Sequence, residues 1–186
     1  MLRIVSSLTL ALLASTAHAQ ARMDDTPSGQ PVPRFVSLKF DASHGRTGPS
    51  MAHPIAWVYR RAGVPMEVIA ETENWRRVRD PQGEITWMHR SILSGRRAAM
   101  TQEETILRAR AEADAPIEAV AEAGVILELD RCRTGWCRAE AGGYRGWVST
   151  DGLWGIYPEE RSAEDQAGRD GSPALSASLT RDTALR

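Results

Sequence analysis

The chain contains an internal repeat of about sixty residues, and this repeat limits its fold more than any other feature of the sequence. The segment from Gly63 to Trp75 matches the segment from Gly124 to Trp136, with the same spacing between the glycine and the tryptophan. Further matching positions lie on both sides: Arg46 and Arg108, Pro54 and Pro116, Ile55 and Ile117, Gly83 and Gly143, Trp87 and Trp147, Leu93 and Leu153. We therefore expect two similar folding units in tandem, at residues 34–100 and 101–158.

Each unit shows the residue pattern of tight turns at matching places. Asp80-Pro81-Gln82-Gly83 has the preferences of a type I turn, and Gly142-Gly143 stands at the same place in the second unit. A further turn is expected just before each first tryptophan, at Glu73-Asn74 and at Thr134-Gly135, because Asn and Gly tolerate a positive φ best. Each unit is thus predicted to contain hairpins.

Strands of five or six residues between such turns predict the all-β class, as a small barrel or sandwich in each unit. The alanine-rich stretch 101–123 resembles a helix in composition. Pro116 lies within it and matches Pro54 of the first unit, so we expect loop and strand there.

The N-terminal residues have the layout of a secretory signal peptide at 1–19. Arg3 is followed by the apolar stretch from Ile4 to Leu13 and by the small-residue cleavage site Ala17-His18-Ala19, which makes Gln20 the expected mature N-terminus. As a helix, the apolar stretch would span roughly 15 Å, about half of a membrane's hydrocarbon core. We expect cleavage near Ala19, a periplasmic or secreted protein, and no stable membrane insertion.

Two segments beside the repeats are poor in large apolar side chains. Residues 20–33 are rich in proline and predicted to be a flexible leader, and residues 159–186 are predicted to be a disordered tail. Neither segment has enough apolar surface to offset the entropy lost on ordering.

Cys132 and Cys137 are the only two cysteines. If Thr134-Gly135 forms a two-residue turn, the cysteines lie opposite each other on paired strands, with Cβ atoms about 4.5–5.5 Å apart, which is close to bridging distance. In an oxidising compartment the expected state is a disulfide. The three histidines of the mature chain all lie in the other unit, so no metal site is expected.

Several classes of function are disfavoured by the sequence. It contains no Gly-x-Ser-x-Gly, no phosphate-binding glycine loop, no His-Glu-x-x-His and no dinucleotide fingerprint, so we expect neither an enzyme nor a cofactor. The formal net charge is −1, which disfavours a dedicated nucleic-acid binder.

The first unit concentrates basic and aromatic residues. From residue 34 to 100 the chain has eleven basic and six acidic residues, whereas from 101 to 158 it has six basic and ten acidic ones. Such residues can form a platform for an anionic or peptide ligand, and the candidate ligand-binding residues are Trp57, Tyr59, Trp75, Arg76, Arg77 and Arg79. The alternative is that the arginines form a solvated face and Trp57 and Trp87 fill the core. We expect Trp87 in the core and Trp75 partly exposed.

When the repeats are superposed, Cys132 and Cys137 fall on Glu71 and Arg76. This correspondence predicts a cross-strand ion pair in the first unit where the second has its disulfide. Such pairs contribute roughly 0.2–1 kcal/mol, and exposed ones often less, so a weaker tie is expected there.

These patterns resemble the bacterial SH3-like domain family, in the tandem form found in exported proteobacterial proteins. The resemblance covers residues 33–158 and rests on Arg46-Thr47-Gly48-Pro49, Trp75-Arg76-Arg77-Val78-Arg79, Leu93-Ser94-Gly95-Arg96-Arg97, the Cys-x4-Cys of the second unit and Leu153-Trp154-Gly155. It implies two five-stranded barrels, export and a binding role. The chain departs from the family at Gly45, where an aliphatic residue is usual, and at Arg110-Ala111, where Gly-Pro is usual.

Two functions of different classes remain. The first is a non-catalytic module that recognises a cell-envelope ligand such as peptidoglycan or its stem peptides. The second is a protein–protein adaptor or regulator of an envelope enzyme. The sequence names neither the cell-wall polymer nor the envelope protein that would be the partner.

Overall fold

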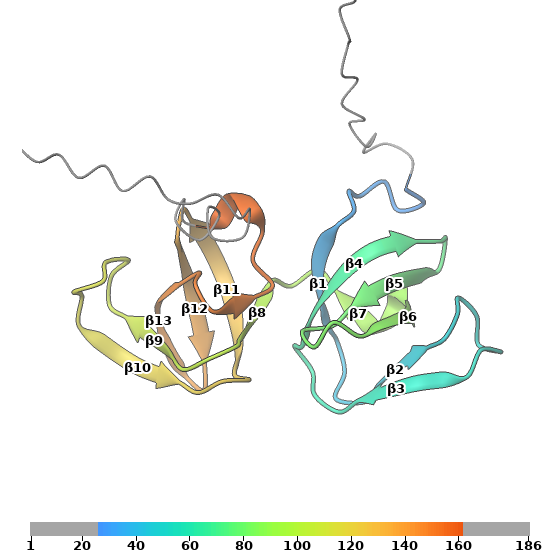
Figure 1. Cartoon of the computed structure of the whole chain (residues 1–186), viewed down its shortest axis with the longest axis horizontal. Helices are drawn as coiled ribbons and strands as arrows, with labels where there is room; N and C mark the ends of the chain where they lie inside the picture. The colour runs from blue at the N-terminus through green and yellow to red at the C-terminus, as the bar shows by residue number, and fades with distance from the viewer. Residues whose placement is uncertain (1–25, 162–186) are drawn as a thin grey trace, which may run out of the picture.

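The computed structural model describes residues 26–161, which form two antiparallel β-sheets side by side (Figure 1). The first sheet contains β1 (Arg34–Leu38), β2 (Ser43–Arg46), β3 (Ile55–Tyr59), β4 (Pro65–Glu71), β5 (Trp75–Arg79), β6 (Ile85–His89) and β7 (Leu93–Ser94). The second contains β8 (Ala98–Thr101), β9 (Thr105–Arg108), β10 (Ile117–Ala121), β11 (Ile126–Arg133), β12 (Trp136–Ala141), β13 (Tyr144–Ser149) and β14 (Leu153–Trp154). Two short 3-10 helices, η1 (Arg90–Ile92) and η2 (Pro158–Glu160), complete the fold.

The two sheets have the same topology. The order β3-β2-β6-β5-β4-β1-β7 recurs as β10-β9-β13-β12-β11-β8-β14, which confirms two tandem all-β units. Each sheet has seven strands where five were expected. The sheets divide between Ser94 and Ala98. The expected boundary after residue 100 falls inside β8, because β8 pairs with β11 and β14 of the second sheet.

The predicted hairpin turns all form. In the β5–β6 turn the backbone N–H groups of Gln82 and Glu84 both donate to Asp80 Oδ1 at 2.9 Å, so the aspartate carboxylate organises the turn. Gly142 and Gly143 join β12 to β13 with φ values of 58° and 84°, a conformation that only glycine adopts easily. The alanine-rich stretch forms β9 and β10, as its proline indicated.

At one close contact between strands, the small and the large residue have changed places between the two repeats. Gly45 lies against Thr86, and an ideal Cβ on Gly45 would come within 2.5 Å of the threonine Oγ1. In the second unit the corresponding pair is Leu107, a buried core residue, and Gly146, whose ideal Cβ would lie 3.0 Å from the Leu107 Cβ. In each pair one residue is glycine, and its missing side chain leaves room for the other residue. Gly45 leaves room for Thr86 in this way, which explains why the usual aliphatic residue is absent at position 45.

The two units pack directly on each other. Met100 and Ile126 of the second sheet pack against the core of the first, which is built on Leu38, Val64, Met66, Val68, Val78 and Met88. Arg61 of the first unit donates from Nη1 to the carbonyl oxygen of Gly124 at 2.9 Å. The first core therefore includes residues of the second unit.

The predicted disulfide is present. Cys132 opposes Cys137 across β11 and β12, with Cα atoms 4.1 Å apart, and Cys137 is fully buried in the second core. The bridge ties the two strands at the end of their hairpin.

The charged counterpart of this bridge is also present, and it is more buried and has more partners than expected. Glu71 opposes Arg76 in the register, and its Oε2 lies 3.0 Å from Arg76 Nε and 2.6 Å from Arg34 Nη2. The Glu71 side chain has no exposed surface, so this is a buried cluster rather than a surface pair. The simple cross-strand pair that was expected is extended, because Arg34, from β1, and the backbone N–H of Ser28 join it.

The pKa of the Glu71 carboxyl reflects these contacts. Burial alone would raise it, but hydrogen bonds from Ser28 and Arg34 and the charge of Arg34 lower it from 4.5 to about 2. Burial likewise lowers the pKa of the Arg76 guanidinium, and the charge of Glu71 opposes that shift.

Parts of both expected flexible ends have defined contacts. In the leader, Gly29 N donates to the carbonyl oxygen of Thr26 and Ser28 N to Glu71. At the other end, Glu160 forms an ion pair with Arg97, and Arg161 is buried. The predicted signal peptide 1–19, leader residues 20–25 and tail residues 162–186 lie outside the described residues.

We expect acid to destabilise the protein through Glu71. A carboxyl group whose pKa is lowered in the folded state adds stability above its unfolded pKa of about 4.5, and this stability is lost as the pH falls towards 2. At 1.36 kcal/mol per pKa unit the contribution is at most roughly 3 kcal/mol. Urea unfolding of the wild type between pH 5 and pH 2.5 should show this loss, and Glu71→Gln should lack that part of it.

Glu67→Gln is the matched control, since Glu67 also pairs with an arginine, but with the partly exposed Arg79 rather than with two buried guanidinium groups. If the acid loss is specific to the Glu71 cluster, Glu67→Gln should not reproduce the change seen with Glu71→Gln. Identical curves for the wild type and Glu71→Gln below pH 4.5 would contradict the assignment.

Candidate functional site

A groove of about 660 Å³ lies between the two units. Its first wall comes from β1, β4 and β5, and its second from the segment that runs from β14 through η2. The lining residues used below are Phe35, Glu67 and Arg79 on the first wall and Trp154, Tyr157 and Glu159 on the second. It is a concave surface that both repeats must build together.

Three aromatic rings form the apolar part of the groove. The Phe35 ring packs edge-on against Trp154 and tilted against Tyr157, with ring centroids 5.2 Å apart in both cases. The backbone N–H of Phe35 donates to the Tyr157 hydroxyl oxygen at 3.0 Å. This cluster joins β1 to the C-terminal segment and leaves ring surface lining the groove.

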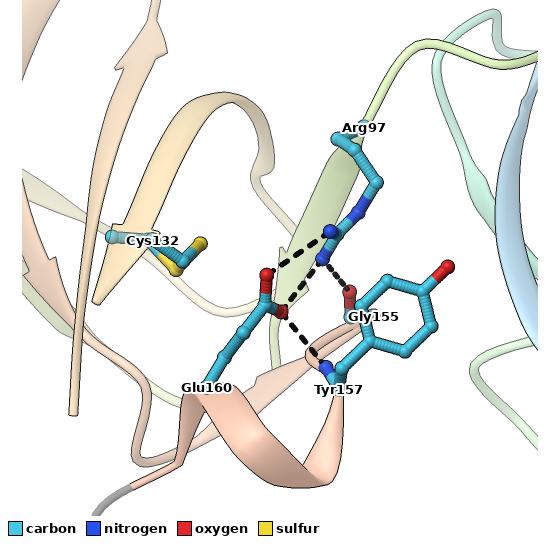
Figure 2. The surroundings of a disulfide bond; sticks show 6 residues. Arg97, Cys132, Gly155, Tyr157 and Glu160 are labelled. Atoms are coloured by element: carbon cyan, nitrogen blue, oxygen red, sulfur yellow. Dashed lines mark hydrogen bonds and ion pairs between the residues drawn. A yellow bond between two sulfur atoms is a disulfide. The ribbon is translucent and has the colours of Figure 1, made fainter. Parts of the chain in front are cut away.

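Arg97 fixes the position of the C-terminal segment (Figure 2). Its Nη1 and Nη2 donate to the two carboxylate oxygens of Glu160 at 3.1 and 2.8 Å, and Nη2 also donates to the carbonyl oxygen of Gly155 at 3.2 Å. The guanidinium lies 4.3 Å from the centroid of the Tyr157 ring, and Glu160 accepts the Tyr157 backbone N–H at 2.9 Å. One arginine therefore positions both the turn and the tyrosine that lines the groove.

Charged groups border the rings. Arg79 Nη1 lies 3.0 Å from Glu67 Oε2, and the Arg79 side chain is 45 % exposed, so solvent or a ligand can reach its guanidinium. Glu159 adds an exposed carboxylate on the opposite wall. The groove thus offers ring faces with both a cation and carboxylates, which suits a ligand carrying apolar parts and both charges.

The six sequence-predicted site residues do not form one surface. Trp57 is half exposed on the edge strand β3. Tyr59 donates its hydroxyl to Asp80 Oδ2 at 3.0 Å, and burial together with the Asp80 charge raises its pKa, so it anchors the hairpin turn. Only Arg79 lines the groove between the units.

The expected exposure of the tryptophans is reversed. Trp75 is 9 % exposed because the ring of His89, opposite it in the register, packs edge-on at 5.4 Å. Trp87 is only partly buried, on the outer face between Arg46 and Arg77. Arg76 faces inward with Val78, which is why it is buried in the Glu71 cluster.

Sequence reasoning missed Phe35, Trp154 and Tyr157 as site residues. The Leu153-Trp154-Gly155 motif was noticed only as part of the family resemblance. Its position at the contact between the repeats follows from tertiary packing, which a single sequence does not encode locally.

The described part of the chain was also searched for other classes of site. Within residues 26–161 no cluster of three or more His, Cys, Asp or Glu is arranged to hold a metal ion. No helix in this range is long and apolar enough to cross a membrane.

Comparison with known proteins assigns the fold. A family model described as a bacterial SH3 domain matches residues 45–95 and, separately, residues 101–155. The chain belongs to the bacterial SH3 domain family. The two matches agree with the two sheets, so this is a tandem bacterial SH3 protein.

Solved structures add little to the family assignment. The chain is similar to structures of NlpC2 and NlpC1 from Trichomonas vaginalis, each at 14 % identity and a TM-score of 0.29. These matches cover 66 % and 65 % of this chain but 48 % and 45 % of those chains, so this chain spans about half of their length. Likeness at this level carries no information on function. A search of curated proteins found no match.

The position of Tyr157 should depend on Glu160. Glu160→Ala removes a partly buried carboxylate that accepts from both Arg97 and the Tyr157 backbone. Hydrogen bonds to charged groups contribute about 1.5–3 kcal/mol, so we expect a loss of that order in the free energy of unfolding, measured with urea. Glu159→Ala, the neighbouring exposed carboxylate, should change stability by less than about 0.5 kcal/mol. Equal effects of the two variants would contradict the role given to Glu160.

Proposed function

We propose that this protein is a non-catalytic binding module of the bacterial envelope, and that it holds a cell-wall peptide in the groove between its two repeats. The observation that carries the proposal is the combination of three aromatic rings with the Arg79–Glu67 pair in one groove of about 660 Å³. Grooves of this size, mostly apolar with a few placed charges, are typical of small-ligand and peptide sites.

The chemistry of the groove fits a peptidoglycan stem peptide. Such peptides combine short apolar side chains with carboxylates and, in many cases, a free amine. Arg79 is placed to bind a carboxylate, while Glu67 and Glu159 can accept an amine. The rings of Phe35 and Trp154 supply the apolar contact.

A binding role is favoured over catalysis by the residue types in the groove. Among its lining residues in the described part of the chain there is no serine, cysteine or histidine. Bacterial SH3 domains are in general binding modules, often for cell-wall material, which agrees with this assignment. The envelope location rests on the signal peptide predicted at residues 1–19.

A second candidate function is that of an adaptor for another protein. The edge strand β3 and the loop before it expose Met51, Ile55, Trp57 and Val58. An apolar edge strand is a common docking element for an extended segment of a partner. This surface is separate from the groove, so the two candidates can be tested independently.

Co-sedimentation with purified peptidoglycan tests the proposal. We expect the wild type to bind, and Arg79→Gln and Trp154→Ala to weaken binding by about tenfold or more, as central contact residues do. Arg79→Gln changes an exposed side chain, so it keeps the test valid if Trp154→Ala affects folding.

Trp57→Ala is the matched control, since it removes an exposed tryptophan away from the groove. It should leave co-sedimentation unchanged. If the wild type does not sediment with peptidoglycan, or if Trp57→Ala alone abolishes sedimentation, the groove assignment is wrong.

A further inference from the structure

A second groove, of about 510 Å³, lies entirely within the second repeat. It is formed by the start of β9, the loop between β9 and β10, the turn before β12 and the end of β13. The residues that give it chemical character are Trp136, Glu103, Glu104, Asp151 and Arg108. None of them lines the groove between the repeats.

In the first repeat the matching tryptophan, Trp75, is covered and only 9 % exposed. There, Trp75 is opposed by His89, whose ring covers it at 5.4 Å, and His89 is held by a 2.7 Å hydrogen bond between its Nδ1 and Ser91 Oγ. The histidine acts as a fixed cover on the tryptophan.

In the second repeat this cover is missing. The residue opposite Trp136 is Ser149, which corresponds to His89 and is too small to cover an indole. Its hydroxyl donates to Asp151 Oδ2 at 2.9 Å, and Asp151 stands where the first repeat has Ser91. Compared with the first repeat, the second therefore has Ser149 in place of His89, which uncovers the tryptophan. It also has Asp151 in place of Ser91, which adds a carboxylate.

The charge of the groove is negative. Glu103, Glu104 and Asp151 are exposed carboxylates, whereas Arg108 is the one cation among the lining residues. The Arg108 guanidinium is directed to the carbonyl oxygen of Ala115, to which Nη1 donates at 2.8 Å. An aromatic face beside carboxylates is the combination that binds an ammonium group.

Trp136 differs from Trp147, the matching partner of Trp87, in its contacts with cations. Trp147 of the same repeat is already covered by the protein's own cations, since the guanidinium carbons of Arg133 and Arg131 lie 4.2 and 5.5 Å from the ring centroid. Among the cation–ring contacts found within residues 26–161, none involves Trp136. Trp136 is partly exposed and lines the groove, so a cation from outside can reach it.

We propose that the groove around Trp136 is a binding site for a primary ammonium group on a peptide, such as a lysine-like side chain. The ammonium lies against the indole and is neutralised by Asp151 and Glu104. This site goes beyond the groove between the repeats and does not depend on it, because the two share no lining residue.

Titration of the full-length mature protein with a defined probe tests the proposal. The probe is Gly-Lys-Gly with both termini blocked, and the control probe is the same peptide with an acetylated lysine, which keeps the size and removes the charge. Binding is followed by NMR chemical shifts of the Trp136 indole N–H. We expect the lysine probe to bind, to weaken with added salt, and the acetylated probe to bind at least tenfold more weakly.

Two variants at position 149 test whether binding depends on the groove being open. Ser149→His rebuilds the cover of the first repeat and should reduce affinity for the lysine probe at least tenfold. Ser149→Ala keeps the groove open and should stay within about twofold of the wild type. Asp151→Asn should weaken binding several-fold without changing the cover, so it serves if Ser149→His affects folding.

Three results would overturn the proposal: no binding of the lysine probe to the wild type, equal binding of the acetylated probe, or equal binding by Ser149→His. None of these results bears on peptidoglycan co-sedimentation through the groove between the repeats, so failure of one site is distinguishable from failure of the other.

Discussion

An arginine stands at the start of the first sheet and another directly before the second, and each guanidinium is at least partly withdrawn from solvent and pairs with a carboxylate. Arg34 pairs with Val68 in the first sheet, and Arg97 takes the matching place in the second, where its carbonyl oxygen accepts the Leu129 N–H. Arg34 finds its partner within its own repeat, in Glu71. The position of Glu71 in the second repeat is occupied by Cys132, so Arg97 takes its carboxylate from Glu160 after the last strand. Because a charge withdrawn from water is costly when unpaired, this choice of partner fixes the C-terminal segment. The groove between the repeats follows from that segment.

The two repeats keep one backbone by changing residues in compensating pairs. Gly45 with Thr86 and Leu107 with Gly146 each place one side chain where a strand crosses another closely. The acidic and basic pair of the first hairpin likewise becomes a disulfide in the second, so neither hairpin is left untied. Where the exchange is not compensated, as at His89 and Ser149, the result is an open surface instead of an altered core. Divergence between the repeats therefore appears mainly as different surfaces on the same fold.

Most of the fold was predictable from the sequence because its signals are local. The repeat, the glycine turns and the cysteine pair each act over a few residues, and the structure confirms the all-β units and the bridge. The site was not predictable in the same way. Arg76 and Arg77 are adjacent in sequence, but side chains alternate between the two faces of a strand, so Arg76 lies in the buried cluster and Arg77 on the surface. Trp75 lies on the same strand face as Arg77, and its burial depends on His89, a partner that only the strand register identifies.

The last described residues, 158–161, are held by polar contacts rather than by apolar packing. Residues 159–161 belong to the tail 159–186, which is poor in large apolar side chains, and this is why disorder was expected there. Their order comes instead from polar contacts: the carboxylate of Glu160 on Arg97, its backbone carbonyl oxygen accepting the Gly135 N–H, and Arg161 donating to the carbonyl oxygen of Leu153. The Gly135 turn is the one that aligns Cys132 with Cys137, so the disulfide hairpin and the C-terminal turn support each other. Tyr157 lies between these contacts and Phe35 of the first repeat. The groove between the repeats thus depends on a chain of polar contacts that begins at the hairpin bearing the disulfide.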